Sequence, residues 1–276
     1  MIRYSCHSEN FGRMPAPETF KLIRSLEFDC IDVASRSLVP QEEILENPQK
    51  CARQLNALSA QYQLPLSELF LSAVELDGQA VSPVSDRSRT ADFENAFEAV
   101  CTFAAEAGFS SIMGYAGTVD PELGFSSSFD RAARTLKRQA EIAARHGLAF
   151  HVEPSRTSLL NTVQAALDMA EAAPGLGYTL DFLHYQINGV PQEESMKLIP
   201  YAGHLHVRQA KRGVGKCDFM EGDIDYAQIV RELKRQNWSG DIAMEFWNSN
   251  ELAECGVQAV EQNIVMRYCL KQLFKE

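Results

Sequence analysis

The sequence lacks the features that identify several classes of protein. Its 276 residues contain no apolar run near the roughly 20 residues of a membrane-spanning helix. The first ten residues show no basic stretch followed by an apolar one, so we expect no signal peptide. The seven cysteines are scattered and never form a C-x-x-C pair. We therefore expect reduced thiols in a cytoplasmic protein without membrane contact, and neither a disulfide framework nor a cysteine zinc site.

Positive charge is scarce as well. The 37 acidic side chains outnumber the 26 basic ones, which gives a formal net charge of −11. Proteins that follow nucleic-acid phosphates usually carry a basic patch or a high pI, whereas the pI of this chain is near 5.1. We therefore expect no nucleic-acid partner.

Short runs rich in β-forming residues alternate with longer segments of helical period. The eight expected strands are Ile2–Cys6, Cys30–Ser35, Leu69–Val74, Ser110–Tyr115, Ala149–Glu153, Tyr178–Phe182, His204–Val207 and Ile242–Phe246. The expected helices are Glu18–Phe28, Glu42–Tyr62, Thr90–Ala107, Phe129–His146, Leu159–Ala173, Glu193–Leu198, Tyr226–Gln236 and Asn250–Phe274. Near-continuous apolar strands are typical of parallel sheets that are buried on both faces. The pattern predicts an α/β protein with one domain over residues 1–276, a single (β/α)8 TIM barrel with a long C-terminal helix.

An open, doubly wound sheet is the structural alternative. Its dinucleotide-binding version carries G-x-G-x-x-G after the first strand, and this sequence has no such motif there.

Two junctions carry clear local signals. Gly147 follows a basic helical turn and predicts a helix end, and Asp225 predicts the N-cap of the helix that begins at Tyr226.

Polar side chains gather where the last four expected strands end. Glu153 ends the fifth strand, Asp181 lies near the end of the sixth and Glu245 near the end of the eighth, while the seventh contains histidines. The carboxyl ends of TIM-barrel strands meet at one mouth, where active sites lie. Three carboxylates that converge there would repel one another unless a cation balanced their charge. The pattern therefore predicts a divalent-metal site.

The two-residue period of a strand decides between the histidines of the seventh strand. His204 and His206 point the same way, and His206 lies nearer the carboxyl end. We therefore take His206 as the ligand beside the three carboxylates and expect His204 and His151 one layer deeper. This oxygen-rich set favours Mn²⁺ first and Mg²⁺ or Co²⁺ next, with catalytic Zn²⁺ as a further alternative.

Together these segments resemble the xylose isomerase-like TIM-barrel superfamily, and most closely its sugar phosphate isomerase/epimerase branch. The resemblance rests on HVEP at 151–154, LDFLH at 180–184, HLHVR at 204–208, AMEFW at 243–247 and the run GDIDY at 222–226. It implies that the metal ligands are Glu153, Asp181, His206 and Glu245. It also implies that Glu153 and Glu245 form the acid/base pair, as in ketose 3-epimerases, and that His184 and Arg212 contact the substrate.

One position departs from that pattern. Ketose 3-epimerases carry a second glutamate six residues after the first, and this chain has Leu159 there. The departure argues against a strict ketose 3-epimerase and leaves other reactions of the scaffold open.

The expected activity is that of a metal-dependent isomerase or epimerase of a sugar or a sugar-derived keto substrate. A glutamate would remove a proton next to a metal-bound carbonyl, with an enediolate as intermediate. A lyase or dehydratase of the inosose, dehydroshikimate or 3-keto-glycoside type is the alternative. A DNA-repair endonuclease is a further hypothesis, which is disfavoured because Asp223-Ile224-Asp225 stands where that enzyme needs D-x-H. The last hypothesis is a non-catalytic barrel that only binds ligands.

Basic residues after the seventh strand bear on the kind of substrate. They are Arg208, Lys211, Arg212 and Lys216. Arginine suits phosphate and carboxylate groups, so we expect a small sugar or keto-polyol, with such a group as an option and Arg212 as its contact. His7 after the first strand and Trp247 beside Glu245 are further predicted substrate contacts. No residue specifies an oligomer, and a homo-oligomer formed through the final helix stays open.

Overall fold

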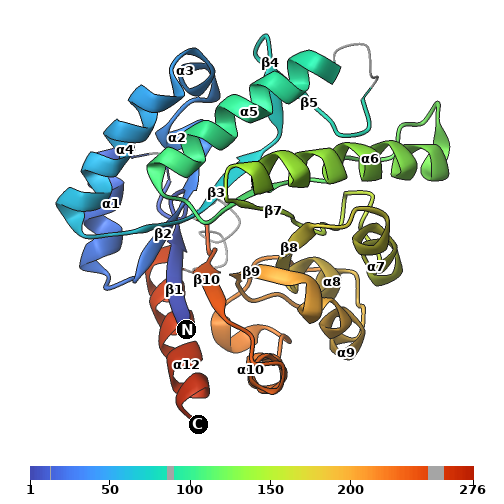
Figure 1. The fold of residues 1–276 in the computed structure, drawn as a ribbon. Coiled ribbons are helices and arrows are strands. Elements are labelled where there is room, and N and C mark those ends of the chain that lie inside the picture. The colour runs from blue at the N-terminus through green and yellow to red at the C-terminus, as the bar shows by residue number, and fades with distance from the viewer. Residues whose placement is uncertain (13, 86–89, 248–257) are drawn as a thin grey trace.

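The fold is a closed barrel of eight parallel strands surrounded by helices (Figure 1). The structure is a computed structural model that describes residues 1–12, 14–85, 90–247 and 258–276. The strands follow one another around the barrel in the order β1, β2, β3, β6, β7, β8, β9 and β10, and β10 pairs with β1 to close it. Their bounds are β1 Ile2–His7, β2 Cys30–Ala34, β3 Leu66–Ser72, β6 Ser111–Gly114, β7 Ala149–Val152, β8 Leu176–Asp181, β9 Ala202–Val207 and β10 Gly240–Met244. The predicted (β/α)8 barrel is confirmed.

Helices cover the outside of the barrel between successive strands (Figure 1). The longer ones are α1 Ala16–Ser25, α4 Pro48–Tyr62, α5 Thr90–Ala107, α6 Gly124–Arg145, α7 Val163–Ala172, α10 Tyr226–Arg235 and α12 Ala259–Lys275. Shorter turns are α2 Ser35–Leu38, α3 Gln41–Glu46, α8 Leu183–Ile187, α9 Gln192–Ser195, η2 Met196–Tyr201 and η3 Phe219–Glu221. The predicted C-terminal helix is present as α12, while its expected start at Asn250 lies outside the described residues.

Local sequence signals set several helix ends as expected. The Asp225 side chain accepts a hydrogen bond from the Gln228 backbone N–H and caps α10. Gly147 follows the end of α6 with a φ of +73°, in the left-handed region that glycine enters without steric cost. Both junctions therefore lie where the local sequence predicts them.

Other boundaries differ from the prediction. The helix expected over Glu42–Tyr62 is divided into α3 and α4, because Pro48 disfavours helical geometry at Asn47, whose side chain then caps α4. The third strand ends at Ser72 rather than Val74. The chain continues into an antiparallel hairpin of β4 Val74–Leu76 and β5 Gln79–Val81.

The described cysteines are unpaired, as expected: Cys6, Cys30, Cys51, Cys101, Cys217 and Cys269 are free, and Cys255 lies outside the described residues. Among the described residues, no helix combines the length and apolar character that crossing a membrane requires.

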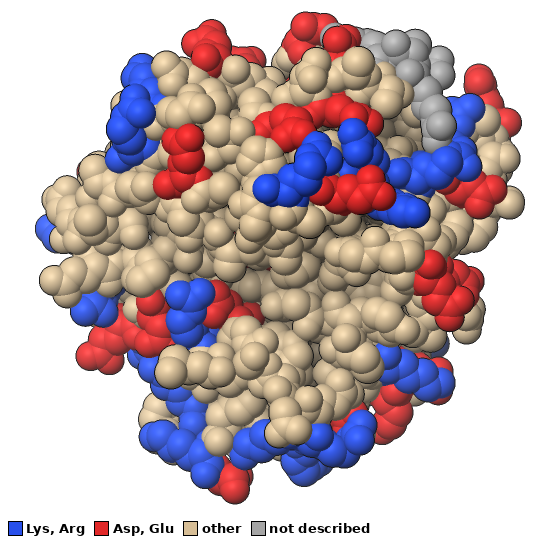
Figure 2. All heavy atoms as spheres, viewed as in Figure 1, with Lys and Arg blue, Asp and Glu red and all other residues tan. Residues whose placement is uncertain are grey.

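Exposed ion pairs join the outer helices. In Figure 2, basic and acidic side chains lie side by side over α5 and α6. Arg138 contacts Glu94 at 3.0 Å and Glu141 at 3.4 Å, and Arg145 pairs with Glu98. Solvent-exposed pairs of this kind contribute about 0–1 kcal/mol each, so the buried interior is the main source of stability.

The barrel interior is polar, although TIM-barrel interiors are usually filled by branched apolar side chains. Glu68 on β3 accepts hydrogen bonds from Ser111 Oγ at 2.7 Å and Thr179 Oγ1 at 2.6 Å, and it lies 2.6 Å from His151 Nδ1. Asp32 on β2 lies 2.7 Å from His204 Nε2. Ser111 lies on β6, which is the neighbour of β3, whereas the contacts of Glu68 with His151 and Thr179 and that of Asp32 with His204 join strands that are not neighbours and so run across the barrel interior.

Small residues make room for this network. An added Cβ at Gly203 would lie 2.3 Å from His151 Nε2, and one at Gly177 would lie 2.7 Å from His151 Cδ2. The imidazole of His151 therefore fits only because β8 and β9 carry glycine beside it. The structure places His151 and His204 in the deeper layer, as predicted.

Replacing Glu68 by alanine tests whether the network stabilises the barrel. Its loss leaves two hydroxyls and an imidazole buried without their acceptor, so we expect the unfolding free energy to fall by about 3–5 kcal/mol. Urea denaturation followed by circular dichroism measures the change. The matched control is Glu106→Ala at an exposed site on α5, which should change stability by less than about 0.5 kcal/mol. Equal stability of the two variants would contradict this role of Glu68.

Candidate metal and active site

Four strands bring the predicted ligands to the carboxyl end of the barrel. Glu153 directly follows β7, and its N–H donates to the Gly114 carbonyl at 3.1 Å. Glu245 directly follows β10, and its N–H donates to the Val207 carbonyl at 3.0 Å. Asp181 is the last residue of β8, and His206 lies one residue before the end of β9. All four are at most 2% exposed, so the barrel fixes them in a buried layer.

The donor atoms of these residues face one another. His206 Nδ1 lies 3.2 Å from Glu153 Oε1 and 3.6 Å from Glu245 Oε2. Glu153, His206 and Glu245 each offer a donor atom within 4.8 Å of the other two, and Glu153, Asp181 and His184 form a second such group. The structure therefore brings the predicted ligands together, with Glu153 shared by both groups.

This donor set suits a divalent cation. The three buried carboxylates carry three negative charges. Among the described residues, the cationic side chains beside them balance these charges only if histidines are protonated. Carboxylate oxygens and one imidazole nitrogen are ligands that Mn²⁺, Mg²⁺, Co²⁺ and Zn²⁺ accept. The other nitrogen of His206, Nε2, lies 3.5 Å from Asp32 Oδ2. A carboxylate behind a ligating histidine orients the ring and fixes its tautomer.

The electrostatics of the cluster follow from burial and charge. Burial raises the pKa of Glu153, but the nearby His184 and His206 outweigh it and hold that pKa well below its usual value. Burial lowers the pKa of His206, yet Glu245, Asp32 and Glu153 raise it well above its usual value. With no cation bound, an ionised Glu153 is therefore paired with a positively charged His206.

Arg208 is the residue that the sequence reasoning passed over in favour of Arg212. Its guanidinium extends into the carboxylate layer, where Nη2 lies 2.9 Å from Asp181 Oδ2 and 3.0 Å from Glu245 Oε2. Arg212 is exposed and lies against Gly189 at the surface. The signal was present in the spacing, because Arg208 follows His206 by two residues and so shares its inward direction.

His184 joins the site from α8. Its Nε2 lies 3.4 Å from Glu153 Oε2, and its side chain is 13% exposed. Burial lowers the pKa of His184, but the Glu153 carboxylate offsets burial and raises it above the usual value. The predicted neighbour of the site is therefore in contact with it, next to the glutamate.

Aromatic rings form one wall above the ligands. His7 is stacked on Trp247 with ring centroids 5.2 Å apart. It also forms a T-shaped pair with Phe70, with ring centroids 4.9 Å apart. The Glu9 N–H donates to His7 Nδ1, which leaves the proton of the neutral ring on Nε2. Burial lowers the pKa of His7. His7 Nε2 and Trp247 Nε1 are buried without a hydrogen-bond partner among the described residues.

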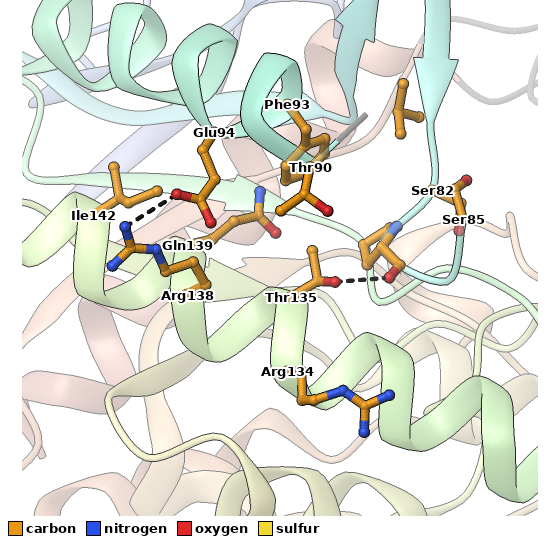
Figure 3. Close-up of a pocket in the computed structure, with 12 residues that line it drawn as sticks. Ser82, Ser85, Thr90, Phe93, Glu94, Arg134, Thr135, Arg138, Gln139 and Ile142 are labelled. Carbon is orange, nitrogen blue, oxygen red and sulfur yellow. Dashed lines mark hydrogen bonds and ion pairs between the residues drawn. The ribbon is translucent and has the colours of Figure 1, made fainter. Parts of the chain in front are cut away.

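A separate cavity of about 280 Å³ lies outside the barrel, between α5, α6 and the end of the β4–β5 hairpin (Figure 3). Arg138 and Glu94 face each other there, and Thr135 donates to the Pro83 carbonyl. Ser85 and Thr90, on either side of the undescribed residues 86–89, form part of its lining. The cavity is lined by residues other than those predicted for the active site.

Comparisons with known proteins agree with the barrel fold. The sequence profile of the family described as xylose isomerase-like TIM barrel matches residues 20–264. No curated protein matches the chain. Similar solved structures include D-allulose 3-epimerase from Methylomonas sp., with 18% identity, a TM-score of 0.77, and coverage of 99% of this chain and 98% of that chain.

Two further structures carry other activities. The 3-keto-D-glucoside 4-epimerase from E. coli has 16% identity and a TM-score of 0.73, over 98% of this chain and 100% of that chain. A probable 3-DHS dehydratase from Bacillus anthracis has 17% identity and a TM-score of 0.72, over 98% of both chains. At these identities the likeness establishes the fold, and the reaction has to be argued from the site.

Proposed function

The chain belongs to the xylose isomerase-like TIM-barrel family, and on this basis we propose that it is a divalent-metal-dependent isomerase or epimerase of a sugar or sugar-derived keto substrate. One observation carries the proposal. Glu153, Asp181, His206 and Glu245 converge in a buried layer at the carboxyl ends of four successive barrel strands. In TIM barrels, catalytic residues come from the ends of several different strands at this face.

The same four residues are the proposed metal ligands, with Mn²⁺ as the first choice and Mg²⁺, Co²⁺ or Zn²⁺ as alternatives. A cation held there would polarise a substrate carbonyl and stabilise the negative charge of an enediolate. Asp32 supports the set from behind, because it faces the nitrogen of His206 that does not face Glu153 and Glu245.

Glu153 and Glu245 are the proposed acid and base. β7 and β10 are separated by two strands, so these glutamates approach the substrate from different sides of the mouth. One carboxylate removes the proton from the carbon next to the carbonyl, and the other returns a proton to the opposite face. The low pKa of Glu153 keeps its carboxylate ionised at neutral pH, which is the form that a base requires.

The remaining predicted contacts receive roles from their surroundings. His7 offers an unused Nε2–H donor to a substrate oxygen, and Trp247 offers an apolar ring face to the carbon skeleton. His184, beside Glu153, orients a hydroxyl. Arg212 lies on the turn that follows β9, where it would contact a phosphate or carboxylate that extends out of the mouth. The proposed substrate is thus a small keto-polyol.

A lyase on the same scaffold is the second candidate, and one position favours it over a ketose 3-epimerase. Leu159, which stands where those epimerases carry a second glutamate, is fully buried in the apolar core. His184 would then protonate a leaving group instead of orienting a hydroxyl, since its raised pKa keeps a proton available.

A substrate panel in D₂O tests the proposal and separates the two candidates. We expect the Mn²⁺-loaded protein to incorporate deuterium next to the carbonyl of at least one keto sugar, sugar phosphate, inosose or dehydroshikimate. Retention of all oxygens in the product, read by mass spectrometry, identifies an isomerase or epimerase, while loss of water identifies a lyase. Neither exchange nor conversion across the panel would contradict both.

Glu153→Gln and Glu245→Gln each remove one acid/base carboxylate with little change in shape. We expect turnover to fall by at least about 10²–10⁴-fold, with an unchanged circular dichroism spectrum. The control is Glu171→Gln, at an exposed position on α7, which should keep wild-type turnover. Near-wild-type activity in both site variants would rule out the assigned roles.

Removal of the metal by a chelator is expected to abolish turnover, and added Mn²⁺ is expected to restore it. Binding to the folded state alone also raises the unfolding free energy by about 2.7 kcal/mol at a concentration one hundred times Kd. Thermal unfolding of the chelated and reloaded protein measures this gain. A fully active protein that contains no metal by elemental analysis would contradict the proposed cofactor.

A further inference from the structure

Arg208 is the side chain of the site that the proposed chemistry leaves without a role. Its Nη2 contacts Asp181 Oδ2 at 2.9 Å and Glu245 Oε2 at 3.0 Å, and its Nε also lies 2.9 Å from Asp181 Oδ2. Both carboxylates belong to the proposed ligand set, on strands β8 and β10. A single cationic group thus contacts one oxygen of each of two proposed metal ligands.

The backbone of Arg208 is held by a different residue from those that its side chain contacts. The Arg208 N–H donates to the Tyr226 hydroxyl at 3.1 Å, and that hydroxyl donates to the Arg208 carbonyl at 2.6 Å. The side chain is 13% exposed, so the protein does not enclose it completely. A change of side-chain rotamer can therefore withdraw the guanidinium without moving β9 or α10.

The two carboxylates are held toward Arg208 by different means. Asp181 Oδ1 accepts the Leu183 N–H at 2.9 Å, which turns Oδ2 toward the guanidinium. Glu245 Oε2 is buried and has its ion pair with Arg208 but no hydrogen bond among the described residues. Without Arg208, the metal-free site would contain a buried carboxylate oxygen whose one remaining ion-pair partner among the described residues is His206.

We infer that Arg208 is a resident counter-cation of the metal-free site, and that binding of the divalent ion requires its guanidinium to leave Asp181 and Glu245. This inference rests on the proposed function, because it takes these carboxylates as metal ligands. Two positive groups cannot share the same oxygens at close range without strong repulsion in a buried site. Arg208 therefore stabilises the metal-free protein and lowers the affinity of the site for the metal ion.

A purely structural ion pair would behave differently. If Arg208 only held the two strands together, its loss would disturb the ligands and weaken metal binding. If Arg208 competes with the metal, its loss destabilises the metal-free protein but strengthens metal binding. The direction of the change in metal affinity therefore separates the two roles without any measurement of activity.

The test compares wild type with Arg208→Gln by calorimetric titration of the chelator-treated protein with Mn²⁺, and by thermal unfolding with and without Mn²⁺. We expect Arg208→Gln to lower the Tm of the metal-free protein by several degrees, to bind Mn²⁺ at least tenfold more tightly, and to gain more in Tm on loading. The matched control is Arg212→Gln, which removes the same charge from an exposed position four residues away and should leave the Mn²⁺ affinity within twofold. An unchanged or weaker affinity in Arg208→Gln would overturn the inference.

Arg208→Lys guards against a glutamine variant that does not fold. Lysine keeps the charge but lacks the fork that contacts both carboxylates, so we expect an Mn²⁺ affinity between those of wild type and Arg208→Gln. A lysine variant that binds Mn²⁺ no more tightly than wild type counts against the inference. If both proteins bind Mn²⁺ as expected but no substrate turns over, the proposed function fails and the inference stands. If no variant binds Mn²⁺, the inference and the metal site both fail.

Discussion

Negative charge buried at the carboxyl end of the barrel has to be balanced, and the arrangement of the surrounding residues follows from this requirement. Three carboxylates lie there at 0–2% exposure, on strands that the closed barrel prevents from moving apart. Arg208 spans two of them, and His206 contacts Glu153 and Glu245 with one nitrogen. In the metal-free protein these positive groups balance part of the negative charge of the carboxylates. A divalent ion would balance it more completely.

The polar layer beneath this site gives it a fixed base. Asp32 contacts both His204 and His206, and Glu68 gathers hydrogen bonds from three further strands. Burial raises the pKa of Glu68, but His204 and His151 outweigh burial and hold that pKa at about 2, which keeps the carboxylate ionised. A barrel filled with branched apolar side chains would pack as well but could not orient His206 through its second nitrogen.

The buried setting also suits the proposed proton transfers. Charges act over short distances more strongly in a site from which water is excluded, so small displacements of a guanidinium or an imidazole have large effects on a neighbouring carboxylate. The aromatic wall of His7, Phe70 and Trp247 helps to exclude water from the same space. The residues at these strand ends therefore both balance the buried charge and limit the access of water.

Much of the fold and of the site could be predicted from the sequence alone. The alternation of apolar strands with helical segments determined the eight-stranded barrel, because strands buried on both faces leave a distinct pattern. The two-residue strand period selected His206 over His204, and the structure places His204 one layer deeper, hydrogen-bonded to Asp32. Periodicity carried these predictions because side-chain direction within one strand is a local property.

The tertiary structure decided what depends on pairs of residues far apart in the chain. Arg208, and not Arg212, reaches the carboxylates of Asp181 and Glu245. This depends on how β8 and β10 place the two carboxylates on either side of β9. The contacts of Glu68 with His151 and Thr179 across the barrel depend in the same way on strand order and stagger. A sequence read one segment at a time contains the direction of each side chain but not the distance between side chains on different strands, and that distance determines which charges meet.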